Sequence, residues 1–434
     1  MLRSLLGWVV DFQDDTEPKG MLQAAAYGFF IMFSYYILRA VRDEISAEDR
    51  GNLQIIWTVV FFVMIFAVQG YSWIASRYSR GVFVPLANRF FIVCLIGFWA
   101  SLVFLPEASR PWIDRVFYVW TSVFALFVVT VFWGLVADCF NNDQGKRLFG
   151  FIAIGSSVGG IVGSAVTAYL AVRVPVFALL LISCVPLEIA SWYAGSLHRN
   201  FGTGSVRAVG EADRPLAGDA WSGMKAVFAS PYLLGIAGFI ALMTFASTIL
   251  YFAQSDLVYA AMTDRGERTA FLARIDLVVN VLTILFELYL TARIIRWLGV
   301  GVTLALVPAA VAVGFLVLGL YPTLWTLVVV QVIYRAGRYG LAKPAREVLF
   351  TVVSREEKYK SKAFIDAAVY RGGDLVSGWA YAGFAAVGLT IGSIALVAAP
   401  LAAVWAVVGL RIGRRGETLA TDLAAASEEA VPVG

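Results

Sequence analysis

The sequence is poor in charged residues, histidine and cysteine, and each shortage excludes a class of protein. Charged residues make up 15% of the 434 positions and apolar residues 60%. About a quarter of a soluble domain is charged, so a soluble domain is excluded. The single histidine, His198, cannot form a histidine cluster, and Cys94, Cys139 and Cys184 lack the paired spacing of a disulfide framework or metal site. No nucleophile–base pair or cofactor loop stands out, so we expect neither an enzyme nor a bound cofactor.

Long apolar runs fill most of the chain and predict an all-α membrane protein. Each run is long enough to cross a hydrocarbon core, which takes about 20 helical residues. Backbone polar groups in lipid must be satisfied within their own segment, so these runs are expected to be helices. The twelve predicted transmembrane helices lie near residues 20–38, 53–76, 82–105, 113–137, 148–171, 174–195, 231–254, 270–297, 300–320, 323–342, 363–387 and 389–411.

The longest polar interruption, Ser196 to Ser230, divides the predicted helices six and six. Two pseudo-symmetric six-helix bundles joined by a cytoplasmic linker are typical of major-facilitator-type transporters. The tail from Gly416 is rich in Ala and Glu, and we expect it to be disordered. The predicted organisation is an interfacial segment with a short amphipathic helix at 1–19, bundles at 20–195 and 231–411, a linker at 196–230 and a cytoplasmic tail at 412–434.

Lysine and arginine are unevenly distributed over the short loops, which predicts the orientation of the chain. The loops at 77–81, 196–230 and 343–362 are rich in lysine and arginine, so they and both termini are expected in the cytoplasm. The net charge of +4 reflects this sidedness, and no nucleic-acid partner is expected. The opposite side holds few cations, mainly Arg110, Arg115, Arg173, Arg265 and Arg268.

The segment GSSVGGIVGS at 155–164 has two interpretations. It contains G-x-x-x-G twice, and such small residues allow close helix packing within a membrane. The same letters spell G-x-S-x-G around Ser157, but a hydrolase elbow needs a strand–turn–helix context and a histidine partner. Because Ser157 lies in an apolar run, we favour packing.

A cation-rich stretch from Arg335 to Asp374 lies between two apolar runs, and its cations either fix this loop on the cytoplasmic side or turn inward to bind an anionic substrate. Arg338 is followed by Tyr339, and a guanidinium binds phosphate in a fork and stacks on aromatic rings. That combination suits a nucleotide. Further along, Arg346 fits a phosphate contact or simply the inner membrane surface, and Arg371 with Asp374 fits either the site or a structural ion pair.

The end of the first predicted span carries a second group of candidates. Arg39 and Asp43 lie four residues apart on one helical face, next to Arg42. The group fits either a self-paired helix end that snorkels to the surface or an anion contact in a central cavity, where Tyr35 or Tyr36 would stack on the base. We hypothesise that Arg39, Arg338 and Arg371 converge on one water-filled cavity.

Carboxylates inside apolar runs are candidates for coupling or gating. Glu188 lies in the sixth predicted span and Glu287 in the eighth, and ionisable residues in a span usually face a cavity or a partner. Asp43 and Asp374 belong to the same candidate group. Pairing with another helix is the alternative for each of them.

Several short motifs surround the candidate residues in both halves of the chain. They are Arg338-Tyr339, Lys343-Pro344-Ala345-Arg346-Glu347, Ile365-Asp366 and Arg371-Gly372-Gly373, with Arg42-Asp43, Phe132-Trp133-Gly134 and Lys146-Arg147-Leu148-Phe149 in the first half. These motifs resemble the ATP/ADP translocase family, the nucleotide exchange transporters of plastids and intracellular bacteria. The family's tenth and eleventh spans carry a Lys-Tyr pair, a small-Pro-x-Lys-Glu run, an Ile/Val-Asp helix and Arg-x-Gly. The resemblance implies a free-standing bacterial relative in the inner membrane that binds ATP.

These observations together favour a secondary active transporter that works by alternating access. Its expected substrate is an anionic, phosphorylated metabolite, with ATP/ADP-type exchange favoured. One alternative is a proton-coupled facilitator for another amphiphile or drug, in which Glu188 or Glu287 titrates. The other is a non-transporting membrane protein that handles lipid or assists assembly. The expected partners are the small-molecule substrate and the lipid bilayer, and the protein is expected to be a monomer.

Overall fold

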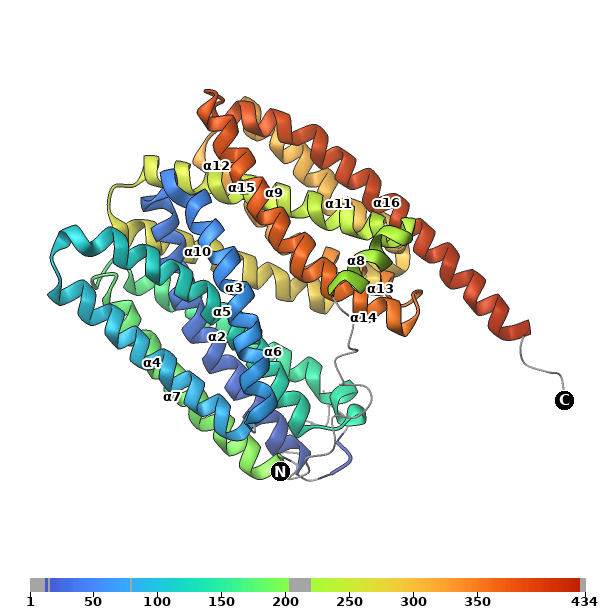
Figure 1. Ribbon diagram of the computed structural model, residues 1–434, viewed down its shortest axis with the longest axis horizontal. Helices are drawn as coiled ribbons and strands as arrows, with labels where there is room; N and C mark the ends of the chain where they lie inside the picture. The colour runs from blue at the N-terminus through green and yellow to red at the C-terminus, as the bar shows by residue number, and fades with distance from the viewer. Residues whose placement is uncertain (1–11, 15, 79, 203–219, 430–434) are drawn as a thin grey trace. The chain divides into compact units, whose positions relative to one another are not determined.

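The computed structural model describes residues 12–14, 16–78, 80–202 and 220–429 (Figure 1). Within these ranges every regular element is a helix, which confirms the all-α class. The interfacial helix predicted near the N-terminus and residues 203–219 of the predicted linker lie outside the described residues.

The chain divides into two compact units, which we describe separately. The first comprises Met1–Ala208 and Val258–Asn280, and the second Val209–Leu257 and Val281–Gly434. The predicted domain boundaries stay a prediction, and this division differs from them in assigning Val258–Asn280 to the first unit. The elements of the first unit are α2 (Glu17–Glu48), η1 (Arg50–Asn52), α3 (Leu53–Arg77), α4 (Arg80–Phe104), η2 (Glu107–Ser109), α5 (Arg110–Cys139), α6 (Asn142–Leu170), α7 (Ala178–Phe201) and most of α10 (Arg265–Leu285).

The second unit contains the remaining helices, several of them interrupted. They are α8 (Ala220–Ala229), most of α9 (Pro231–Ala261), η3 (Phe286–Leu290), α11 (Thr291–Leu320), α12 (Leu324–Gly337), η4 (Arg338–Ala342), α13 (Lys343–Leu349), α14 (Arg355–Phe364), η5 (Ile365–Val369), α15 (Tyr370–Ala386) and α16 (Ile391–Glu429).

Nine helical stretches of the described chain are long and apolar enough to cross a membrane. One of them, Arg265–Leu320, has 56 residues, far more than the roughly 20 that one crossing needs. Within it Gly299 has φ of 76°, a conformation that favours glycine, and lies between the predicted spans at 270–297 and 300–320. The protein is therefore a multi-pass membrane protein, and the number of twelve spans stays a prediction.

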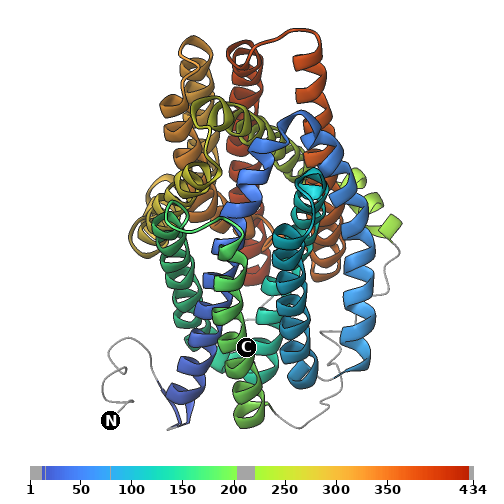
Figure 2. The same cartoon turned by 90° about the vertical axis from the view of Figure 1, so that its left-hand side faces the viewer.

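Helix α2 is the centre of the first unit and packs along α6 and α7 (Figure 2). The three glycines Gly155, Gly159 and Gly163 of α6 face the α2 backbone. A Cβ atom on Gly159 would lie 2.1 Å from the carbonyl oxygen of Phe29, and a Cβ on Gly155 or Gly163, one turn to either side, would lie 2.6 Å from a backbone carbonyl oxygen of α2. The packing interpretation of this segment is confirmed. Ser157 lies inside α6, without the strand–turn–helix context of a hydrolase elbow.

Helix α16 corrects one prediction in the second unit. The tail from Gly416 was expected to be disordered, but α16 continues to Glu429. Its Ala-rich sequence has a high helix propensity, which the composition argument for disorder ignored. The Glu417 carboxylate also accepts a hydrogen bond from the backbone N–H of Val300, next to the break at Gly299. This contact attaches the start of the tail to α11, alongside which α16 packs (Figure 1).

Three π turns interrupt the helices of the second unit. They are η3, η4 and η5, and they contain Glu287, Arg338 and Asp366 respectively. A π turn inserts one extra residue into a helix and is often found at functional sites. The sequence patterns had indicated continuous helices there, because periodicity does not reveal a single inserted residue.

Candidate substrate site

A cavity of about 230 Å³ lies in the second unit and contains three of the predicted site residues, Arg338, Tyr339 and Arg346. Its charged lining consists of three cations and one carboxylate, so positive charge is in excess by two. The cavity is suited to an anion. The lining residues are Phe239, Met243, Arg338, Tyr339, Ala342, Lys343, Arg346, Asp366 and Tyr370.

Tyrosines surround the guanidinium of Arg338. Its Nη2 donates to the hydroxyl of Tyr370 at 2.5 Å and its Nη1 to the hydroxyl of Tyr334 at 3.3 Å. The rings of Tyr334, Tyr339 and Tyr370 lie 5.3–5.9 Å from its Cζ. Among the described residues no carboxylate forms an ion pair with Arg338. Hydroxyls and rings orient the guanidinium without cancelling its charge, and a half-buried cation in that state attracts an anionic ligand.

The π turn η4 places Arg338 in this cavity, and the sequence around it explains why the turn is stable. Pro344 has no N–H, so the carbonyl of Gly340 loses its donor four residues ahead. The hydroxyl of Thr291 lies 2.5 Å from this carbonyl and 2.8 Å from the carbonyl of Phe286, and its single proton is shared between the two. Gly340 permits η4 to pack closely against η3, since a Cβ there would lie 2.6 Å from the Cβ of Phe286.

Arg346 is partly neutralised, in contrast to Arg338. Its Nη2 lies 3.3 Å from Glu347 and its Nη1 lies 3.7 Å from Asp366. Burial alone would raise the pKa of the Glu347 carboxyl, but a hydrogen bond from Lys362 and the nearby charge of Arg346 together lower the pKa. Glu347 is therefore ionised at neutral pH and holds both cations in place.

Arg371 and Asp374 lie on α15, next to the cavity but outside its lining. The Cζ of Arg371 lies 5.8 Å from the ring centre of Tyr370. Asp374 interacts electrostatically with Arg371 and Arg338. Both predicted residues thus belong to the surroundings of Arg338, and their roles stay predictions.

In the first unit, Arg39 and Arg42 are both paired with carboxylates. Arg39 Nε lies 3.1 Å from Asp276 on α10 and 3.7 Å from Asp43, and Arg42 Nη2 lies 2.8 Å from Asp43. This geometry matches the self-paired alternative, with an additional partner on α10 that the sequence did not indicate. Arg39 belongs to the first unit and Arg338 to the second, so their convergence on one cavity stays a prediction.

Two tyrosines of α2 flank this charged group. The hydroxyl of Tyr36 donates to Asn280 Oδ1 at 2.9 Å, and its ring lies 5.7 Å from Cζ of Arg39. The ring of Tyr35 packs edge-on against Tyr36. These contacts do not test the predicted stacking of Tyr35 or Tyr36 on a nucleotide base, which stays a prediction.

The predicted coupling carboxylates have cationic neighbours. Glu188 on α7 pairs with Arg89 on α4 at 2.8 Å, and both side chains are about half exposed. Glu287 in η3 is exposed, with Lys343 as its electrostatic neighbour. Among the described residues no group of acidic, cysteine or histidine side chains could hold a metal ion.

Sequence analysis missed a buried ion cluster at one end of the first unit. Glu44, which has no exposed surface, accepts hydrogen bonds from Arg265 at 2.7 Å and from Arg268 at 2.8 Å. Arg265 also contacts Asp114 at 3.0 Å, and Arg268 contacts Glu48. The available signal was that Arg265 and Arg268 are exceptions to the positive-inside pattern and need acidic partners.

Solved structures with the same architecture include several transporters. The nucleoside transporter NupG matches with a TM-score of 0.62 and 12% identity, covering 92% of this chain and 98% of that one. A D-xylose–proton symporter matches with a TM-score of 0.63 and 13% identity, covering 91% and 98%. The fold is thus the predicted major-facilitator type.

Comparison with known sequences finds similarity to ADP,ATP carrier proteins, although no family model matches the chain. ADP,ATP carrier protein 2 of Chlamydia pneumoniae is 23% identical, over 92% of this chain and 88% of the carrier. ADP,ATP carrier protein 1 of Chlamydia trachomatis is 21% identical, over 86% and 84%. The resemblance to the ATP/ADP translocase family is confirmed along most of the chain.

Proposed function

We propose that the protein is a secondary transporter that exchanges nucleotides across the membrane by alternating access. The observation that carries this proposal is the unneutralised guanidinium of Arg338 in a cavity with excess positive charge. The names of the relatives, which are ADP,ATP carriers, support a nucleotide over other phosphorylated metabolites.

In this proposal Arg338 binds a phosphate oxygen pair of the nucleotide. A guanidinium presents two parallel N–H donors that match a phosphate, and ionised hydrogen bonds are stronger than neutral ones. Lys343 and Arg346 add positive charge at the same cavity, and Tyr339 or Tyr370 offers a ring for the base. Asp366 and Glu347 limit the excess charge, so that the anion can also leave.

We further propose that the protein lies in a bacterial inner membrane with both termini in the cytoplasm. The support is the excess of Lys and Arg in the loops at 77–81, 196–230 and 343–362. The same orientation places the loop around Glu107–Ser109 on the opposite side.

The proposal is tested by exchange of radiolabelled ATP against ADP in proteoliposomes that contain the purified protein. One charged hydrogen bond contributes about 1.5–3 kcal/mol of binding free energy, so Arg338→Ala should raise the nucleotide concentration at half-maximal exchange by about 10- to 150-fold. Arg338→Lys should also impair exchange, because an ammonium cannot form the fork. The matched control is Arg293→Ala, an exposed arginine of α11.

The possible results separate the alternatives. Wild-type exchange in both Arg338 variants would remove Arg338 from the site. Absence of nucleotide exchange in the wild-type protein, with uptake driven by a proton gradient for another solute, would favour a proton-coupled facilitator. Loss of exchange in Arg293→Ala would indicate a general defect in reconstitution.

A further inference from the structure

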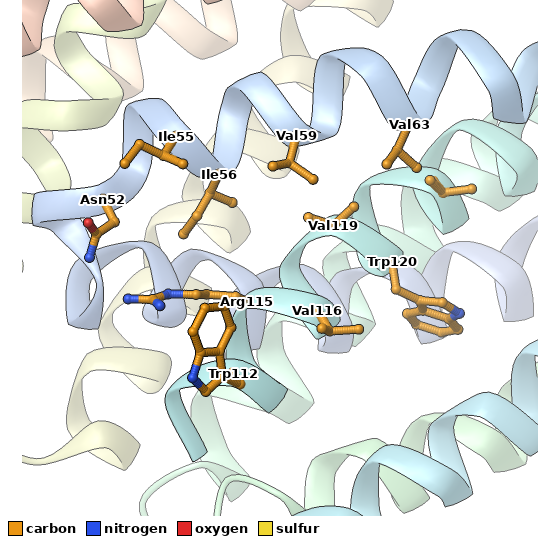
Figure 3. Close-up of a pocket in the computed structure, with 11 residues that line it drawn as sticks. Asn52, Ile55, Ile56, Val59, Val63, Trp112, Arg115, Val116, Val119 and Trp120 are labelled. Atoms are coloured by element: carbon orange, nitrogen blue, oxygen red, sulfur yellow. The ribbon is translucent and has the colours of Figure 1, made fainter. Parts of the chain in front are cut away.

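An apolar groove of about 640 Å³ runs between α3 and α5 of the first unit (Figure 3). Its walls are branched aliphatic side chains and two tryptophans, several of them widely exposed: Val59 is 45%, Val116 57% and Trp112 67% exposed. The lining residues are Asn52, Ile55, Ile56, Val59, Val63, Trp112, Arg115, Val116, Val119, Trp120 and Val123.

Polar groups occur at one end of the groove, where α3 and α5 begin (Figure 3). Arg115 donates from Nε and Nη2 to the carboxylate of Asp49, at 2.5 and 3.1 Å. Asn52 donates to the same carboxylate at 2.7 Å. The third nitrogen of Arg115, Nη1, has no hydrogen-bond partner among the described residues. Cζ of Arg115 lies 4.9 Å from the ring of Trp112, a residue type that concentrates at the headgroup level.

The length of the groove matches one leaflet of a bilayer. From Asn52 to Val63 the wall rises by eleven residue steps, or about 16 Å at 1.5 Å per helical residue. The hydrocarbon core is about 30 Å thick, so the groove extends about half-way through it. An acyl chain that enters at the polar end would therefore reach the middle of the membrane.

We propose that this groove is a binding site for one bilayer phospholipid, with an acyl chain between α3 and α5 and the phosphate on Arg115. Lipid tails are as apolar as the groove walls, so a general hydrophobic effect does not select the occupant. Selection comes from the shape of the groove and from the charged hydrogen bond of Arg115 Nη1 to phosphate. The groove has a charged residue, Arg115, at one end, next to Trp112, and apolar walls along the rest of its length. A phospholipid has the same polarity, with a charged headgroup followed by apolar chains. This site lies outside the candidate substrate cavity and does not depend on the proposed transport activity.

Photo-crosslinking of the full-length protein tests the proposal. A phosphatidylethanolamine with a diazirine in one acyl chain is added to the purified protein, and the labelled residues are mapped by mass spectrometry. Labelling should concentrate on the groove residues of α3 and α5. Val116→Trp fills the groove and should reduce this labelling at least several-fold. Val129→Trp, on the same helix and 42% exposed but outside the groove, should not.

A second probe separates the headgroup from the chain. A diacylglycerol with the same photoreactive chain lacks the phosphate, and the loss of one charged hydrogen bond should reduce its labelling about tenfold. Equal labelling by both probes, or no effect of Val116→Trp, would overturn the proposal. Protein–protein cross-links at groove residues, formed by a bifunctional reagent in the same preparation, would also overturn it, because the groove would then be an oligomer interface.

Discussion

Replacement of Gly159 by alanine should destabilise the first unit, and the structure supports a magnitude. The added Cβ would lie 2.1 Å from the carbonyl oxygen of Phe29 and 2.8 Å from its Cα, both of them backbone atoms. A flexible side chain could move aside, but here the whole of α2 would have to shift by about 1 Å. Overpacking of a well-packed interior costs about 1–3 kcal/mol. For a unit of this size we expect the apparent Tm to fall by about 3–10 °C.

The matched control is Gly150→Ala on the same helix. No described atom lies within 4 Å of a Cβ at Gly150, so alanine should be tolerated there. Alanine is favoured over glycine in a helix by up to about 1 kcal/mol, so the apparent Tm should stay the same or rise slightly. Unfolding of both variants is followed by intrinsic fluorescence on heating in detergent. A Gly159→Ala protein as stable as the wild type would refute the close packing of α6 on α2.

Three further predictions concern a hydroxyl, a buried carboxylate and the orientation of the chain in the membrane. Thr291→Val removes the hydroxyl that satisfies the carbonyls of Gly340 and Phe286, so it should lower the unfolding free energy by about 1–3 kcal/mol in thermal unfolding. Thr121→Val, whose hydroxyl bonds only within its own helix, should cost less. Glu44→Gln leaves Arg265 and Arg268 without their shared buried carboxylate and should lower the unfolding free energy by about 3–5 kcal/mol. Glu188→Gln breaks an exposed pair and should lower it by less than about 1 kcal/mol. Equal melting curves for the two variants would contradict this prediction. In a cysteine-free background, Ser354→Cys should react with an impermeant maleimide only from the cytoplasmic side and Ala108→Cys only from the other, and the reverse pattern would invert the topology.

The helices and the glycine packing could be predicted from the sequence because both depend on local patterns. Long apolar runs require helices in lipid, and a repeat of glycines every four residues defines a smooth helix face. The π turns could not be predicted in this way, since one inserted residue scarcely changes the apolar pattern. Pro344 was the available local signal, because it removes the donor for the carbonyl of Gly340.

The predicted site residues were chosen by type and position, and the structure separates them by their partners. Arg338, Tyr339 and Arg346 line one cavity, whereas Arg39 and Arg42 face carboxylates. The partner of Arg39, Asp276, is more than two hundred residues away in the sequence, and no local pattern links the two. Pairing over such a distance is decided by tertiary packing, which a single sequence does not show.

Arginines in apolar surroundings thus fall into two groups in this protein. Arg265 and Arg268 share the buried carboxylate of Glu44, and removal of that carboxylate would leave them only Asp114 and Glu48 as acidic partners. Arg338 is held by tyrosine hydroxyls, which orient it but leave its charge for a ligand. Where every nitrogen of the guanidinium already has a partner, as in Arg265 and Arg268, the arginine is part of the scaffold, because an incoming phosphate would have to displace those partners. A tyrosine partner does not compete in this way, and for that reason Arg338 is a stronger candidate for the phosphate contact than Arg39.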